Sequence, residues 1–442
     1  MPKLTIDNMP VEVAAGTTVL EAARGVGIVI PHFCYHPALG SVGACRLCAM
    51  TFLDGPIKGV QMSCMVVAQD GMVVSTRDQQ ATAMRQMVIE WLMRNHPHDC
   101  PVCDEGGECL LQDYTIAGGH SRRRYNGPKR TYINQQLGPH IEQEMNRCIQ
   151  CYRCSRFYQE FAGGDDFGVL GSSDRLFFGR LEDGPLLSPF SGNLVDICPT
   201  GVFTDKSARF RGRYWEYQMA PSLCPHCSLG CATTPVARYR ELLKVTARRN
   251  DRVNGWFICD RGRFDNRAVN AVDRPRVARI DGQPASWQAA TTALTSRLQS
   301  FIKNHEPTQL AIVASPRLPL EAQLVAARLS STLGATLCTF VSEEDREAAT
   351  TAVDLLRKNH TLSMHGLSEC DLVAVVATDL LHDGPMLALA LRQAARRGAR
   401  IFAVAPTPTH ELCQLLSLTI TMVSDLNQVP FASAKRPGVI CG

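Results

Sequence analysis

Residues 95–109 read NHPHDCPVCDEGGEC, and this stretch decides how the rest of the chain is interpreted. It contains the ligand pattern His-x3-Cys-x2-Cys-x5-Cys, which begins at His96. Gly106 and Gly107 give the backbone the freedom to curl, so that Cys109 can return toward the first two cysteines. The stretch is too short and too polar to form a core of its own. We therefore predict that a bound metal centre holds it in shape.

The chain of 442 residues is long enough for several domains, and cysteine is its unusual component. Fifteen of its 19 cysteines precede residue 260, and the other four are scattered: Cys338, Cys370, Cys413 and Cys441. We find no secretory signal near Met1 and infer the cytosol, where clustered cysteines indicate metal sites rather than disulfides. No apolar run is long enough to span a bilayer. The formal net charge of +4 is weak evidence for nucleic-acid binding, and we predict none.

The first cysteine group lies in a predicted β-rich domain at residues 1–78. Strands are predicted near residues 3–6 and 11–13, and a capping box at Thr18 and Glu21 begins a helix. Three cysteines share one loop and the fourth arrives from elsewhere, which is typical of a plant-type [2Fe–2S] site, although the spacing differs. A zinc ribbon is the alternative, which the long first gap does not favour. This group, termed site 1, comprises Cys34, Cys45, Cys48 and Cys64.

A helix is predicted over residues 79–95, and it delivers the chain to the second group. Its expected packing face consists of Met84, Met87, Val88, Trp91 and Leu92. The second group has only three cysteines nearby, so a histidine is expected as its fourth ligand. The spacing does not separate His96 from His98. This group, termed site 2, comprises the histidine with Cys100, Cys103 and Cys109.

The third group follows the ligand pattern of bacterial ferredoxins. Residues 148–154 give Cys-x2-Cys-x2-Cys, and a Cys-Pro pair follows at Cys198, which predicts a [4Fe–4S] site. In two-cluster ferredoxins the Cys-Pro cysteine serves the other cluster, so Cys198 could belong to site 2. Counting ligands favours the third group, because that group would otherwise lack a fourth ligand. Site 3 therefore comprises Cys148, Cys151, Cys154 and Cys198.

The fourth group begins a new unit, predicted at residues 220–275. Its pattern is Cys-x2-Cys-x3-Cys-x27-Cys. We interpret it as a further [4Fe–4S] site, with four-cysteine zinc as the alternative. Site 4 comprises Cys224, Cys227, Cys231 and Cys259.

Residues 276–442 have the strand–helix alternation of an α/β domain with a parallel sheet. No Gly-x-Gly-x-x-Gly turn follows any predicted strand, so no phosphate-binding loop is expected. The region also ends without a closing element, and two interpretations stay open: the domain is truncated, or a partner completes its sheet. Helices are predicted over 286–304, 319–333 and 385–399, and strands over 309–314, 372–377 and 400–405.

These motifs together resemble the G-type subunits of the bacterial NADH–quinone oxidoreductases, the large iron–sulfur subunits of respiratory complex I, over nearly all of residues 1–275. The resemblance depends on HPALGSVGACR at 36–46, NHPHDCPVC at 95–103, MNRCIQCYRC at 145–154, SGNLVDICPTG at 191–201 and the cysteines of site 4. It implies an α+β multidomain chain. The parts would be a ferredoxin-like β-grasp domain at 1–78, a loop-rich [4Fe–4S] region at 79–219, a [4Fe–4S] domain at 220–275, and a partial molybdopterin-oxidoreductase-like domain at 276–442.

The resemblance also implies the cofactors and the function. Site 1 would hold a [2Fe–2S] cluster, and sites 2, 3 and 4 would each hold a [4Fe–4S] cluster, with His96 rather than His98 in site 2. The chain would relay single electrons from a flavin- and NADH-binding subunit toward quinone-module iron–sulfur subunits. It would lie in the peripheral arm of respiratory complex I, on the cytoplasmic side of the cell membrane, with no catalytic site of its own. The cluster of site 4 occurs in only some members.

Three alternatives compete with this interpretation. A catalytic subunit of an NAD-linked formate dehydrogenase has the same cluster series, but the comparable Cys338 is followed by Thr339 and Phe340 rather than by histidine. We therefore expect no molybdenum cofactor in residues 276–442. The small subunit of NAD-linked hydrogenases lacks site 4. A structural scaffold with several zinc ions is the non-enzymatic alternative.

Overall fold

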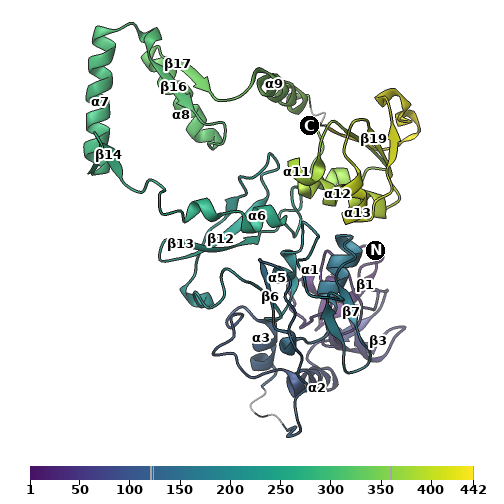
Figure 1. Ribbon diagram of the computed structural model, residues 1–442. Helices are drawn as coiled ribbons and strands as arrows, with labels where there is room; N and C mark the ends of the chain where they lie inside the picture. The colour runs from purple at the N-terminus through teal and green to yellow at the C-terminus, as the bar shows by residue number, and fades with distance from the viewer. Residues whose placement is uncertain (120–121, 123, 359–360, 442) are drawn as a thin grey trace. The chain divides into compact units, whose positions relative to one another are not determined.

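The computed structural model describes residues 1–119, 122, 124–358 and 361–441, and contains both helices and strands (Figure 1). Its residue contacts divide the chain into two compact units. Unit 1 comprises Met1–Asn266 and Ser363–Gly442, and unit 2 comprises Arg267–Leu362. Each unit is described separately. Within the described residues, no helix is both long and apolar enough to cross a membrane.

Unit 1 begins with a five-stranded mixed sheet in the order β2-β1-β5-β3-β4. β1 pairs with β5 in parallel, and the other neighbouring pairs are antiparallel. The predicted capping box is confirmed, because the Thr18 hydroxyl accepts from the Glu21 N–H at the start of α1 (Val19–Gly25). Leu20 of α1 and Phe52 of β3 share one buried core. The strands are β1 (Lys3–Ile6), β2 (Met9–Glu12), β3 (Ala49–Asp54), β4 (Gly59–Met62) and β5 (Val73–Ser75).

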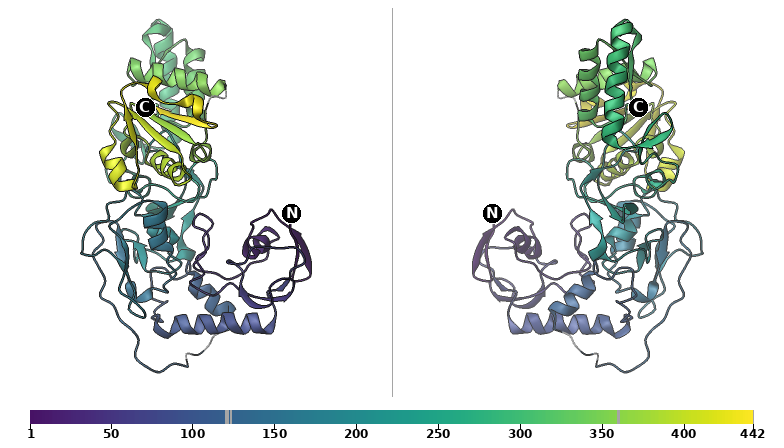
Figure 2. Two further views of the ribbon diagram at one scale, coloured as in Figure 1. Left: turned by 90° about the vertical axis from the view of Figure 1, so that its right-hand side faces the viewer. Right: turned by 90° about the vertical axis from the view of Figure 1, so that its left-hand side faces the viewer.

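The long helix α2 (Gln79–Asn95) confirms the predicted bounds and is the long blue helix in Figure 2. The Asp78 side chain caps its first turn by accepting from the Gln80 N–H. The predicted packing face was partly wrong, because Met87 and Trp91 are exposed. The buried stripe instead runs through Ala81, Val88 and Ile89, with Leu92 packed beside it. The helix is thus rotated relative to our expectation, since apolar side chains of nearly equal hydrophobicity occur on two of its faces.

Short elements follow α2, as expected for a loop-rich region. The longest is α3 (Leu110–Ala117). The paired strands β6 and β9 flank the segment that contains site 3, and the small antiparallel ladder β7–β8 lies within that segment. An extended antiparallel sheet of four strands then precedes α6 (Asp260–Phe264). The remaining elements are β6 (Ile141–Gln143), α4 (Arg153–Ser155), β7 (Gly168–Leu170), β8 (Phe177–Gly179), α5 (Asn193–Ile197), β9 (Phe203–Asp205), β10 (Gln218–Met219), β11 (Ser222–Leu223), β12 (Ala232–Arg238) and β13 (Glu241–Ala247).

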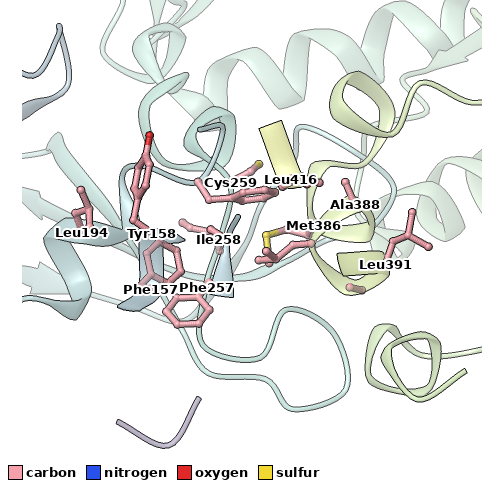
Figure 3. Packing of buried hydrophobic residues seen from close by; sticks show 14 of the residues in the cluster. Phe157, Tyr158, Leu194, Phe257, Ile258, Cys259, Met386, Ala388, Leu391 and Leu416 are labelled. Carbon is pink, nitrogen blue, oxygen red and sulfur yellow. The ribbon is translucent and has the colours of Figure 1, made fainter. Parts of the chain in front are cut away.

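The last part of unit 1 is a parallel sheet in the order β20-β19-β18-β21. Its helix α12 (Pro385–Arg396) buries Met386 and Leu391 in the same core as Phe157 and Phe257, as Figure 3 shows. Arg392 also donates to the backbone oxygen of Phe161. The other elements are α10 (Met364–Ser368), β18 (Leu372–Val376), α11 (Leu380–Asp383), β19 (Arg400–Val404), α13 (His410–Leu416), β20 (Thr421–Val423) and β21 (Pro437–Cys441).

Unit 2 contains a hairpin and a second, two-stranded parallel sheet formed by β16 and β17. Our sequence analysis predicted one parallel sheet after residue 276, whereas hydrogen bonding in the described residues gives two. Periodicity identifies strands but not their pairing partners, which explains the difference. The elements are β14 (Ala278–Ile280), β15 (Gln283–Ala285), α7 (Trp287–Asn304), β16 (Ala311–Ala314), α8 (Leu320–Leu333), β17 (Thr336–Thr339) and α9 (Glu343–Arg357).

Candidate metal centres

Site 1 brings its four cysteines together at one end of the N-terminal sheet. Cys34 lies in the loop after α1, Cys45 and Cys48 precede β3, and Cys64 follows β4. All four thiols are buried. Hydrogen bonds link Cys34 to Cys45 and Cys64, and Cys48 to Cys64, and those to Cys34 draw the pKa of its thiol down. The Phe33 N–H also donates to the Cys45 sulfur at 3.4 Å. The set offers four soft donors, which suit iron–sulfur chemistry.

Site 2 places His96 directly after the last residue of α2. The imidazole is 7% exposed, and its Nδ1 is buried without a hydrogen-bond partner. Burial lowers the pKa of His96 to about 4, so the ring is neutral and able to bind a metal. By contrast, His98 is exposed. A buried imidazole nitrogen that has no hydrogen-bond partner and lies in a loop with three cysteines fits the role of a metal ligand.

The loop that contains the site 2 cysteines is held by charged side chains. Arg147 donates to Asp99 and to Asp104, at 2.9 Å in each case, and Arg209 donates to Asp104 at 2.7 Å. Lys244 binds the Glu108 carboxylate at 2.6 Å. The side chains of Arg147 and Asp104 are almost fully buried. Loss of either side chain would therefore weaken the compensation of the other's buried charge, which is strongly destabilising.

Site 3 is enclosed, and its four cysteines line one small cavity. The cavity walls also include Tyr152, Phe178, Val202 and Phe203. Cys198, whose membership the sequence left open, lies in this cavity with Cys148, Cys151 and Cys154. Burial raises the pKa of the Cys151 thiol to about 12, so a metal that bound this sulfur would have to displace a tightly held thiol proton.

Site 4 lies between the strands around β12 and the start of α6. Cys224, Cys231 and Cys259 are buried, and Cys227 is partly exposed. The Cys224 N–H donates to the Cys231 carbonyl at 2.8 Å, which closes the loop that holds the first three cysteines. Burial raises the pKa of Cys231 to about 12 and that of Cys259 to about 11.

Two glycines lie so close to cysteine sulfurs that a side chain would obstruct the sites. A Cβ at Gly201 would lie 3.2 Å from the Cys103 sulfur of site 2. A Cβ at Gly262 would lie 3.1 Å from the Cys224 sulfur of site 4. Both positions keep space open beside soft donors, and the residues present therefore fit a bulky inorganic cluster.

Cysteines from three sites meet in a single buried apolar cluster. Cys34 and Cys45 of site 1, Cys109 of site 2 and Cys151 of site 3 all belong to it, together with side chains such as Phe33. The Cys109 sulfur is also 3.8 Å from the carbonyl oxygen of Pro199, which follows Cys198 of site 3. Site 3 thus adjoins both other sites through apolar packing.

Buried arginines that the sequence analysis did not identify connect the sites. Arg153 donates to the carbonyl of Tyr35 at 2.7 Å and so ties site 3 to the site 1 loop. Arg263, beside site 4, pairs with Asp196, which precedes Cys198 of site 3. No local sequence motif marks either residue. The signal that could have drawn attention to them is their nearness in sequence to candidate ligands, since Arg153 precedes Cys154 directly and Arg263 follows Cys259 by four residues.

The remaining four cysteines belong to none of these four groups. Cys338 is in β17 of unit 2, Cys370 precedes β18, Cys413 is in α13 and Cys441 ends β21. Within the described residues, no three His, Cys, Asp or Glu side chains are arranged around one point as ligands of a single ion. The metal assignment therefore depends on donor type, burial and spacing.

Five family models match successive parts of the chain. They are a 2Fe–2S cluster binding domain at residues 2–79, the iron–sulfur binding region of NADH-ubiquinone oxidoreductase-G at 85–124, and the ferredoxin-like domain of NADH-quinone oxidoreductase subunit 3 at 138–204. The Fe4S4 domain of molybdopterin oxidoreductases matches 217–271, and molybdopterin oxidoreductase matches 272–427. The chain thus contains domains of the types that bind 2Fe–2S and 4Fe–4S clusters.

Curated relatives agree with these matches. The G-type subunit of the NADH-quinone oxidoreductase of Salmonella typhimurium is 44% identical over 92% of this chain and 45% of its own length. The protein of the same name from Shewanella oneidensis is 40% identical over 99% of this chain and 50% of its own length. The chain spans about half the length of these relatives.

A solved structure, that of an NAD+-reducing [NiFe]-hydrogenase in the H2-reduced state, shares 31% identity with a TM-score of 0.43. That similarity covers 48% of this chain and 90% of the hydrogenase chain. The predicted resemblance is confirmed by the curated relatives and the family models: along nearly all of its length, this chain is similar in sequence to the G-type subunits of the NADH–quinone oxidoreductases.

Proposed function

We propose that the chain is an iron–sulfur electron-transfer subunit that holds one [2Fe–2S] and three [4Fe–4S] clusters. The observation that carries the proposal is the set of sixteen candidate ligands, fifteen cysteines and one histidine, which fall into four groups of four without remainder. All of them except His96 are linked to another member of their own group by shared cavity walls, hydrogen bonds or electrostatic contact. A disulfide framework would require pairs of cysteines rather than groups of four. A zinc scaffold would also use four ligands at each site, and the matches to 2Fe–2S and 4Fe–4S domain models favour clusters over zinc.

The proposed ligands follow the sites as defined above. We assign the [2Fe–2S] cluster to site 1, and the [4Fe–4S] clusters to sites 2, 3 and 4. In site 2 the histidine is His96, supported by its burial and by its unpartnered Nδ1. In site 3 the fourth ligand is Cys198, supported by the cavity that all four cysteines line.

The chain's own residues perform three tasks in this function. The cysteine thiolates and His96 bind iron, and the clusters, when bound, supply one-electron redox chemistry. Side chains such as Phe178 and Phe203 wall off site 3 and exclude water, which lowers the local dielectric constant around the metal. Backbone N–H groups, such as that of Gln150 donating to the Cys148 sulfur at 3.3 Å, stabilise negative charge on the thiolates.

The shared apolar cluster supports a relay among the first three sites. Cysteines of sites 1, 2 and 3 belong to this one contiguous buried apolar cluster. Site 4 shares a different core with site 3, through Cys154 and Cys259. We infer that site 3 is the junction of the relay.

We further propose that the chain works within a larger NADH:quinone oxidoreductase, as the names of its relatives indicate. Electrons would come from a flavin- and NADH-binding subunit and leave toward quinone-module iron–sulfur subunits. The chain would lie in the peripheral arm, on the cytoplasmic side of the cell membrane. The names of the relatives do not favour the formate dehydrogenase or hydrogenase alternatives. We also propose domain boundaries at residues 78, 219 and 275, and we predict that residues 276–442 bind no molybdenum cofactor.

The test is to purify or reconstitute the chain without oxygen, reduce it with dithionite and record low-temperature EPR spectra. We expect signals from one binuclear and three tetranuclear clusters, and a brown protein. An NADH–ferricyanide assay of the isolated chain should show no activity, because we identify no flavin or nicotinamide motif in its sequence. A colourless zinc-containing protein, or appreciable NADH oxidation, would contradict the proposal.

A further inference from the structure

Arg213, beside site 2, contacts backbone carbonyl oxygens of the loop, whereas Arg147, Arg209 and Lys244 contact its carboxylates. Arg213 lies between β9 and β10, far in sequence from the loop of residues 96–109. Its Nη1 donates to the carbonyl oxygens of Pro101 at 3.0 Å and of Cys103 at 3.1 Å. Its Nη2 donates to the carbonyl oxygen of Cys100 at 3.0 Å. A single guanidinium thus binds three carbonyl groups, two of which belong to candidate ligands.

The loop has a glycine where this guanidinium needs space. A Cβ at Gly106 would lie 2.6 Å from Arg213 Nη2 and 2.8 Å from the carbonyl oxygen of Cys100. Such distances are too short for any side chain. Because Gly106 has no side chain, the guanidinium of Arg213 has room to lie against the loop.

The Arg213 guanidinium forms no ion pair with a carboxylate of the residues that the structure describes. Among the ion pairs of the described residues, those of Arg147, Arg209 and Lys244 join carboxylates of the loop, whereas Arg213 appears in none. The nearby Glu216 carboxylate instead accepts from the backbone N–H of Arg213, at 2.8 Å. The guanidinium also lies over the Trp215 ring, at 5.1 Å from the centroid. A positive charge that has no ion-pair partner in the described part of the chain is thereby directed at the backbone of Cys100 and Cys103.

We propose that Arg213 is a positioning residue for site 2, which fixes the shape of the cysteine loop and raises the reduction potential of the cluster bound there. The inference rests on the proposed function, because it requires a cluster at site 2. Reduction adds one electron to the cluster, and a nearby uncompensated cation stabilises the more negative state. The three carbonyl contacts also restrain the loop whether or not the cluster is reduced, which slows the escape of iron.

The experiment compares three variants of the 442-residue chain, reconstituted without oxygen. Arg213→Gln removes both the positive charge and the guanidinium N–H donors that reach three carbonyl groups. Arg213→Lys keeps the charge but loses this planar set of donors. Arg211→Gln is the matched control, because Arg211 is in the same segment but pairs with Glu241 rather than with the loop. For each variant, redox titration followed by EPR gives the potential of the site 2 cluster. A chelator challenge gives its rate of iron loss.

We expect both Arg213 variants to lose site 2 iron about tenfold faster than the control, as is typical when a group that supports metal ligands is removed. Only Arg213→Gln should shift the potential of site 2 to a markedly lower value, because Arg213→Lys retains the positive charge. The EPR signals of sites 1, 3 and 4 should remain, which shows that the variants are folded. If the potential and iron loss of Arg213→Gln equal those of Arg211→Gln, the inference is wrong while the proposed function stands. If the unmodified chain shows no tetranuclear signal from site 2, the proposed function itself is contradicted.

Discussion

Sites 2 and 3 contain the same number of ligands but are built in opposite ways. Site 3 is a cavity walled by aromatic and aliphatic side chains, and burial sets the properties of its thiols. Site 2 is a polar loop, ordered by ion pairs to Asp99 and Asp104 and by the guanidinium of Arg213. The apolar cavity can persist without its metal, whereas the charged loop depends on every partner being present. One chain thus uses packing for one candidate metal site and electrostatics for its neighbour.

The largest expected effect comes from Cys198→Ala, which tests whether site 3 is separate from site 2. We expect the chain to lose the four iron atoms of one [4Fe–4S] cluster and the EPR signal of site 3, because three cysteines remain for four irons. The site 2 signal should persist. Cys370→Ala is the control, because this buried cysteine lies outside the four sites. Loss of the site 2 signal instead would mean that Cys198 serves the other cluster.

A similar loss is expected at site 2 from His96→Ala. Removal of the buried imidazole should abolish or alter the EPR signal of that site and leave the site 3 signal unchanged. The matched control is His98→Ala, since His98 is exposed and two residues away. The assignment of His96 fails if His98→Ala causes the loss and His96→Ala does not.

A smaller effect is expected from Arg147→Gln, which removes one cationic partner from the buried Asp104. Breaking a buried ion pair from one side costs about 3–5 kcal/mol. The site 2 signal should therefore disappear at a lower denaturant concentration than the site 3 signal. Arg346→Gln should change neither, because its pair with Glu343 is exposed, and such pairs contribute about 1 kcal/mol or less. Parallel loss of both signals in Arg147→Gln would show that the two sites are not stabilised independently.

The smallest effect concerns salt. The pairs of Arg209 and Lys244 are not fully buried, so high ionic strength should screen them and speed iron loss from site 2 to a modest degree. The cavity walls of site 3 contain no charged residue among those that the structure describes, so its iron loss should be unaffected. Chelator assays in low and high salt measure both rates in one sample. If high salt speeds iron loss equally at sites 2 and 3, the proposed difference between an electrostatic site 2 and an apolar site 3 is wrong.

The sequence was informative wherever a local pattern determines the structure. The helix that begins after Ser286 and the helix that begins at Pro385 were predicted within three residues of their observed bounds, since caps and periodicity are local signals. The four cysteine groups could also be identified from the sequence, because cysteines that bind one cluster follow characteristic spacings.

Properties that depend on distant residues could not be predicted. The buried face of α2 was misplaced, because Met87 and Trp91 are apolar yet exposed. The contacts of Arg147 and Arg213 join segments more than 40 and 100 residues apart along the chain, so no motif indicates them. Strand pairing after residue 276 was mistaken for the same reason.

The central claim, four clusters on sixteen ligands, is tested most directly by counting iron and acid-labile sulfide in the anaerobically reconstituted chain. One binuclear and three tetranuclear clusters require roughly 14 iron atoms per chain, with an equal number of sulfides. A count near 14 for both is the predicted result. A count of roughly 10 would mean that one tetranuclear site, with site 4 the first to check, holds zinc or no metal, and would contradict the claim.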